Sequence, residues 1–193
     1  QLANAAGKQD SEAEYEYFQA VIFPDNMMEI LDYNRLVTDL AGLDVRTFMR
    51  EVEEKFLVKP VRKACPPVER HTFGMYLGGR WYELKAKEGS FDPKNAIDSL
   101  DVSVLQNNLL APVLKIGDPR TDARINFVGG IRGLAELERK VDRGEYAVAF
   151  SMYPTLMTEV MDIADAGQIM PPKSTWFEPK LRDGMVVHLL EDL

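Results

Sequence analysis

The chain has 193 residues, of which 46% are hydrophobic and 28% are charged, proportions that are typical of a globular protein. The 23 Lys and Arg residues against 31 Asp and Glu residues give a formal net charge of -8, which disfavours a nucleic-acid or anionic-membrane partner. The single cysteine, Cys65, excludes an internal disulfide and a cysteine-based zinc site, so we expect a cytoplasmic protein.

The first sixteen residues differ from the rest of the chain. Gln1 stands where an initiator methionine is expected, and residues 1–16 are acidic and contain Ser and Gly. We therefore expect a flexible tether or the remnant of an upstream domain. Residues 17–193 are expected to form a single α+β domain, the C-terminal half of a longer protein, with the missing N-terminal half as its partner.

Hydrophobic periodicity predicts the elements of the first half. They are, in order, strands over 17–23 and 28–33, a helix over 45–57, strands over 73–77 and 80–86, and a helix over 97–109. Pro24-Asp25-Asn26 and Gly78-Gly79 are turn sequences, so each pair of strands is expected to form an antiparallel hairpin.

The second half alternates between strand and helix. The predicted elements are a strand over 125–128, a helix over 132–141, a strand over 146–150, a helix over 156–164 and a strand over 185–190. The chain as a whole therefore predicts an α+β fold, with antiparallel hairpins in the first half and strand-helix-strand units in the second. We expect a mixed sheet with helices packed on it.

Four charged residues precede the strand over 125–128: Asp118, Arg120, Asp122 and Arg124. The arginines could clamp a phosphate or carboxylate, and an aspartate could bind Mg²⁺ or accept a proton. The alternative is a surface turn in which these charges pair with one another.

Gly129, Gly130 and Arg132 follow the same strand and lead into the helix over 132–141. Glycines there would let an anion approach the N–H groups at the start of a helix. The segment matches neither standard nucleotide-binding fingerprint, and a tight turn that needs glycine explains it equally well.

Residues 170–180, Met-Pro-Pro-Lys-Ser-Thr-Trp-Phe-Glu-Pro-Lys, predict a stiff loop, because three prolines interrupt any regular backbone ladder. Its candidate anion ligands are Lys173, Ser174 and Thr175, with Glu178 for proton transfer. Trp176 and Lys180 are candidate substrate contacts, as are Asn34 and Arg35 at the end of an earlier strand. The alternatives are a structural strap with buried aromatics for the loop, and a simple turn for residues 34 and 35.

No metal ligand set is assigned, because His71 and His188 lack the spacing of a histidine-based site.

Several segments in a fixed order carry a resemblance to a known family. They are Tyr33-Asn34-Arg35, Phe73 to Leu77, Leu100 to Gln106, Asp118 to Arg124, Phe127 to Gly133 and Met170 to Lys180. The set resembles the prokaryotic domain-of-unknown-function family 1015 over about residues 15–193.

The resemblance implies a longer protein. Family members are about twice this length, and their preceding half carries an Asp-Gly-His-His-Arg motif that has no counterpart here. That motif is similar to motifs of the ParB-like and sulfiredoxin-like fold, which includes nucleotide-dependent kinases that act on free serine. The resemblance thus implies a phosphotransferase that uses ATP or ADP with Mg²⁺, shared between the missing half and the loops present here.

The leading hypothesis is the C-terminal portion of a small-molecule phosphotransferase. The arginines at 120, 124 and 132 and the lysine at 173 would bind phosphate or carboxylate, and an aspartate at 118 or 122 would bind Mg²⁺. The rival hypothesis is a non-catalytic ligand-binding or assembly domain. A small-molecule ligand is the expected partner, and a homo-oligomer is a further possibility.

Overall fold

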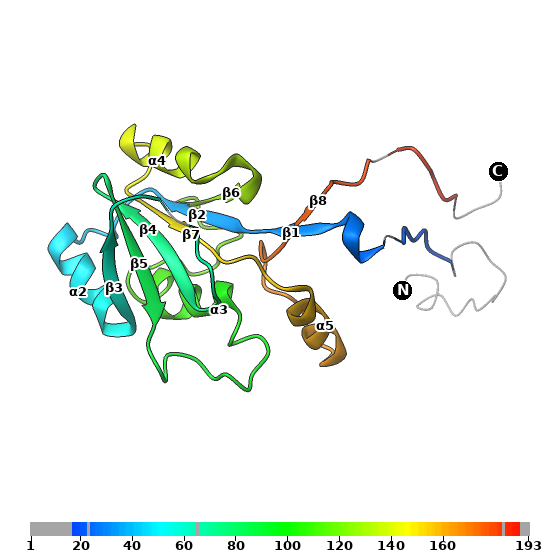
Figure 1. Ribbon diagram of the computed structural model, residues 1–193, viewed down its shortest axis with the longest axis horizontal. Coiled ribbons are helices and arrows are strands. Elements are labelled where there is room, and N and C mark those ends of the chain that lie inside the picture. The colour runs from blue at the N-terminus through cyan, green and yellow to red at the C-terminus, as the bar shows by residue number, and fades with distance from the viewer. Residues whose placement is uncertain (1–16, 23, 65, 183, 190–193) are drawn as a thin grey trace. The chain divides into compact units, whose positions relative to one another are not determined.

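The computed structural model describes residues 17–22, 24–64, 66–182 and 184–189 (Figure 1). It divides into a larger unit, Ile30–Phe177, and a smaller unit made of Gln1–Glu29 and Glu178–Leu193. The described part of the smaller unit holds a short 3-10 helix, η2 (Asp25–Met27), and the ends of two strands. The predicted tether over residues 1–16 lies outside the described residues.

A six-stranded sheet forms the larger unit. Its strands lie in the order β3-β5-β4-β7-β2-β6, and all five pairings are antiparallel. The strands are β2 (Tyr33–Val37), β3 (Phe56–Val61), β4 (Thr72–Leu77), β5 (Arg80–Ala86), β6 (Ile125–Gly129) and β7 (Val148–Ser151). The α+β prediction is confirmed. The predicted mixed character of the sheet is not seen in these pairings, because β2 inserts between β6 and β7 and pairs antiparallel with both.

Helices cover both faces of this sheet (Figure 1). The helices are α2 (Val45–Lys55), α3 (Asp101–Leu105), α4 (Leu134–Asp142) and α5 (Met157–Asp165), and α3 continues into a π-helix, η3 (Gln106–Leu110). Successive strand residues point to opposite faces. Leu36 and Ala149 therefore pack towards α4, whereas Val37 and Phe150 pack into the larger core with α2, α3 and η3.

Among the described residues, a second sheet consists of β1 (Glu29–Leu31) and β8 (Trp176–Glu178). The predicted hairpin between 17–23 and 28–33 is therefore wrong: residues 17–22 form no strand, and β1 pairs with β8 instead. The predicted strand over 185–190 is also not formed in residues 185–189; residues 23 and 190 lie outside the described part. An apolar run can form a strand only where a partner strand meets it, and local sequence does not supply that partner.

One further prediction needs correction, and one strand was not predicted. The helix predicted over 97–109 begins only at Asp101, because the Asn95 side chain accepts from the N–H groups of Ile97 and Asp98 and holds a turn there. Strand β3 was not predicted, because Pro60 lies within it. Proline is tolerated here since β3 is an edge strand that pairs only with β5.

Candidate functional site

A buried arginine on β2 defines the candidate site. The Arg35 residue is 4% exposed and lies opposite Phe127 of β6 and Phe150 of β7. Its guanidinium donates to the backbone oxygens of Tyr33 and Lys173, the latter at 3.0 Å, and stands 5.5 Å from the centre of the Phe127 ring. The sheet register thus buries Arg35 between two phenylalanines, in largely apolar surroundings.

No carboxylate among the described residues forms an ion pair with this guanidinium. Burial lowers the pKa of Arg35 to about 10, and the more distant negative charges of Asp32 and Asp101 offset this only in part. A positive charge without a contacting anion is therefore held inside the protein.

Arg35 lines a pocket of about 510 Å³. The apolar part of the wall comes from α3, η3, β6 and residues 169–172, and includes Phe127 and Met170. The other polar side chains in the wall are those of Ser103, Gln106, Asn107, Asp118 and Arg120. Pockets for small ligands commonly combine an apolar wall with a few polar groups in this way.

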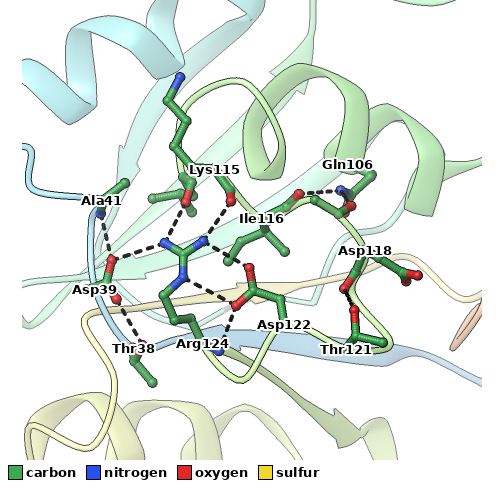
Figure 2. Close-up of polar contacts among 12 residues, drawn as sticks. Thr38, Asp39, Ala41, Gln106, Lys115, Ile116, Asp118, Thr121, Asp122 and Arg124 are labelled. Carbon is green, nitrogen blue, oxygen red and sulfur yellow. Dashed lines mark hydrogen bonds and ion pairs between the residues drawn. The ribbon is translucent and has the colours of Figure 1, made fainter.

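The π-helix η3 supplies part of this wall. Gln106, Asn107 and Leu110 line the pocket, and π-helical turns are frequent at functional sites. The Gln106 side-chain nitrogen donates to the oxygens of Ile116 at 2.8 Å and Gly117 at 3.1 Å (Figure 2). It thereby holds the loop that carries Asp118 and Arg120 against the pocket.

Asp118 and Arg120 form an exposed pair at the pocket wall. Arg120 Nε and Nη2 donate to the two carboxylate oxygens of Asp118 at 2.7–3.1 Å. These hydrogen bonds lower the pKa of Asp118 to about 2. Asp118 is therefore ionised at neutral pH and is a weak proton acceptor.

Arg124 does not line the pocket. Its guanidinium is held by several acceptors within the protein (Figure 2). Nε and Nη2 donate to the two oxygens of Asp122 at 3.3 and 2.9 Å, which lowers the pKa of that carboxyl. Nη1 donates to Leu114 O and pairs with Asp39, and Nη2 also donates to Lys115 O. All five N–H bonds thus have protein acceptors, so Arg124 and Asp122 brace the loop, as the surface-turn alternative predicts.

The glycines after β6 make room for protein groups. A Cβ on Gly129 would lie 2.5 Å from the Trp176 ring, and one on Gly130 would lie 1.9 Å from Asp32 Oδ1. Arg132, in the 3-10 helix η4 (Gly130–Arg132), is exposed. These residues do not line the pocket of Arg35, so they are not brought together with Arg120.

The loop over 170–180 divides between two roles. Met170, Pro171 and Pro172 line the pocket. The buried Ser174 hydroxyl donates to Pro171 O at 2.6 Å, and Thr155 Oγ1 donates to Ser174 O at 2.9 Å, which ties the loop to the segment before α5.

The next part of the loop packs towards Tyr33. Lys173 is exposed, with its Nζ 5.6 Å from the centre of the Tyr33 ring. The rings of Trp176 and Tyr33 pack edge to face, with their centres 5.2 Å apart. Thr175, half-buried, lies between them and does not line the pocket. The strap alternative therefore describes residues 173–176 better than an anion-binding role does.

The two remaining candidates of the loop, Glu178 and Lys180, belong to the smaller unit. Asn34 faces away from Arg35 along β2, and its Oδ1 accepts from the N–H of Met152 at 2.9 Å. The polar pocket residues missed by sequence reasoning are Ser103, Gln106 and Asn107. They lie within the predicted helix over 97–109, and their placement beside Arg35 distinguishes them.

A buried polar cluster adjoins the pocket and was also missed. Asp101, whose side chain is 8% exposed, accepts from the His71 N–H at 2.9 Å, and its Oδ2 is buried without a partner. Burial raises the pKa of Asp101 to about 7. Nearby, Arg70 pairs with Glu159 at 2.7 Å.

A family model described as "Protein of unknown function (DUF1015)" matches residues 1–103, more than half of the chain. The chain belongs to this family. The match ends before the segments at 118–124, 127–133 and 170–180. The position of this chain as a C-terminal half and the ParB-like relationship stay predictions. No curated protein matches the chain.

Solved structures that match the chain in part include a free serine kinase in complex with AMP, at 13% identity and a TM-score of 0.46. A variant of free serine kinase in complex with ADP matches at 14% identity and a TM-score of 0.44, and a conserved hypothetical protein from Pyrococcus furiosus at 15% and 0.46. Each match covers 79% of this chain, but this chain spans only 55–57% of the solved chains. At these values the likeness carries no function over to this chain.

The described residues contain no helix that is long and apolar enough to cross a bilayer. They also contain no group of three or more acidic, histidine or cysteine side chains that could hold a metal ion.

Proposed function

We propose that the pocket beside Arg35 binds a small metabolite through a phosphate or carboxylate group. We further propose that the domain is part of a small-molecule phosphotransferase. The observation that carries this proposal is the buried guanidinium of Arg35, which lines a pocket and contacts no carboxylate among the described residues.

The hydrogen-bond inventory of Arg35 leaves capacity for a ligand. A guanidinium has five N–H donors, and two of these meet the backbone oxygens of Tyr33 and Lys173. Three donors thus have no acceptor in the described part of the chain. A buried charge is costly unless it is paired, so an anion with two or three acceptor oxygens would be stabilised here.

Arg120 supplies a second positive group on the same wall. Its side chain is 68% exposed and its Nη1 has no acceptor in the described residues, whereas Nε and Nη2 bond Asp118. Arg35 would therefore bind the anion, and Arg120 would add a weaker, solvent-screened contact. The apolar wall formed by Phe127 and Met170 would accommodate the rest of the ligand.

Phosphoryl transfer depends mainly on positioning and on stabilising negative charge, which are the tasks that Arg35 and Arg120 suit. The carboxylates of Asp118 and Asp122 do not fit a Mg²⁺ site as they are arranged, because each is bonded to an arginine. Proton transfer by Asp118 is disfavoured by its pKa of about 2.

The rival function is ligand binding without catalysis. The pairing of Asp118 and Asp122 with arginines favours it. The two proposals share the pocket and differ only in whether the bound ligand reacts.

Isothermal titration of this chain with inorganic phosphate, ADP and ATP, with and without Mg²⁺, tests both. We expect one of these anions to bind, and the Arg35→Met variant to raise its Kd about tenfold or more, since a hydrogen bond to a charged group contributes about 1.5–3 kcal/mol. Arg132→Met, at an exposed arginine outside the pocket, is the matched control and should bind normally.

Binding to none of the three anions, or unchanged binding by Arg35→Met, would refute the anion site. Binding without ATP-dependent phosphorylation of any small metabolite, tested on the chain together with any segment that precedes it, would leave the non-catalytic function.

A further inference from the structure

The buried carboxyl of Asp101 adjoins the pocket wall. Asp101 begins α3, and the next two residues, Val102 and Ser103, line the same pocket as Arg35. The charges of Asp101 and Arg35 act on each other: Arg35 lowers the pKa of Asp101, and Asp101 raises that of Arg35. An ionised Asp101 is therefore a fixed anion within the field of the ligand-binding guanidinium.

Asp101 is incompletely satisfied in this position. Oδ1 accepts from the His71 N–H, whereas Oδ2 is buried without a partner. Burial of a carboxylate oxygen without a hydrogen bond disfavours the ionised form. Its folded-state pKa of about 7 means that both protonation states are populated at neutral pH.

The charged groups around Asp101 come from several elements. Arg35 lies on β2, Arg70 and His71 precede β4, and Glu159 lies on α5. Arg70 forms an ion pair with Glu159 at 2.7 Å. The His71 ring bonds Ser99 O at 2.9 Å, and burial lowers its pKa below 6.5.

We infer that Asp101 controls the affinity of the Arg35 pocket for anions, so that the pocket binds an anion more tightly when Asp101 is protonated. This inference rests on the proposed anion site. When Asp101 is ionised, its negative charge lowers the positive potential around Arg35 and repels an anionic ligand. By linkage, a bound anion favours proton uptake by Asp101.

Sulfate is the suitable probe, because phosphate itself titrates near neutral pH and sulfate does not. We expect the Kd for sulfate to rise about sixfold between pH 6.5 and 8.5, which is the part of a tenfold total change that falls in this window when the bound anion raises a pKa of about 7 by one unit. Burial lowers the pKa of His71 from its usual value, and the Asp101→Asn variant separates the contribution of Asp101 from that of His71. In Asp101→Asn the Kd should stay constant across the window and lie near the wild-type value at low pH.

A second measurement needs no variant. Calorimetry of sulfate binding at pH 7, in two buffers of different ionisation enthalpy, should show uptake of a fraction of a proton by the wild-type chain. A pH-independent Kd in the wild type, an unchanged pH dependence in Asp101→Asn, or no proton uptake would overturn the role of Asp101. Absence of sulfate binding at every pH would instead refute the anion site itself.

Discussion

Replacement of Arg35 by methionine separates a functional arginine from a structural one. Methionine keeps an unbranched stem, although it is shorter than arginine, and it removes the guanidinium. The burial of that group lowers its pKa from 12.5 to about 10, which corresponds to roughly 3 kcal/mol of unfavourable free energy for the charged form in the folded state. Because Arg35 is protonated in the folded and unfolded states at pH 7, this full amount opposes folding there.

The substitution also has a cost. It removes hydrogen bonds to the backbone oxygens of Tyr33 and Lys173, and bonds from a charged donor contribute about 1.5–3 kcal/mol each. At the lower end of that range the two losses total roughly 3 kcal/mol and nearly cancel the gain. We therefore expect Arg35→Met to change the free energy of unfolding by less than about 1 kcal/mol, or the Tm by less than about 4 °C.

Thermal unfolding followed by circular dichroism checks this expectation. Phe150→Ala is a sensitive control, because Phe150 is fully buried opposite Arg35 and its loss should cost about 3–5 kcal/mol. If Arg35→Met lowered the stability as much as Phe150→Ala, the main role of the guanidinium would be to stabilise the fold. The reasoning that its charge is kept for a ligand would then fail.

The two Asp-Xaa-Arg units before β6 should respond differently to substitution. Arg124→Met should lower the Tm, because all five donors of Arg124 are bonded within the protein. Arg120→Met should weaken anion binding with little change in Tm. Asp118, whose pKa is lowered to about 2, contributes stability that is present above pH 4 and lost only as the pH falls towards 2. Wild type and Asp118→Asn should therefore show the same pH dependence of Tm between pH 5 and 8, and a difference in slope there would contradict the pairing. Gly129→Ala should displace the ring of Trp176 and shift its indole N–H resonance in an NMR spectrum, and an unchanged resonance would show that the 2.5 Å approach is relieved elsewhere.

Local signals in the sequence predicted the elements whose structure is decided locally. The β4–β5 hairpin follows from Gly78 and Gly79, which both have positive φ in the turn. The helix α2 follows from its period and from Asp44, whose side chain accepts from Thr47 N–H at 3.0 Å. These predictions need no knowledge of distant parts of the chain.

Pairings between distant segments could not be predicted in this way. The partner of β1 is β8, about 150 residues further along the chain, and no local pattern distinguishes it from the segment at 17–22. Similarly, β2 separates β6 from β7 although it precedes both by more than 80 residues. Strand pairing across such distances depends on the packing of the whole core.

The candidate site shows the same division. The sequence predicts Arg35 as a candidate ligand contact, but its burial, with no carboxylate partner in the described part of the chain, follows from its place between β6 and β7. Conversely, Arg124 and Ser174 have side chains suited to phosphate, but the fold bonds both to backbone oxygens. Residue type predicts which chemistry is possible, and tertiary contacts decide which groups keep donors for a ligand.

Direct observation of an anion at Arg35 is the most direct test of the proposed site. Crystals of the chain soaked in selenate, with diffraction data collected at the selenium edge on protein that contains ordinary methionine, would locate a bound anion by its anomalous signal. We predict a peak within hydrogen-bonding distance of the Arg35 guanidinium, about 3–4 Å from its nitrogen atoms to the selenium, that is absent in crystals of Arg35→Met. Peaks confined to exposed arginines such as Arg132, with none at Arg35, would contradict the proposed site.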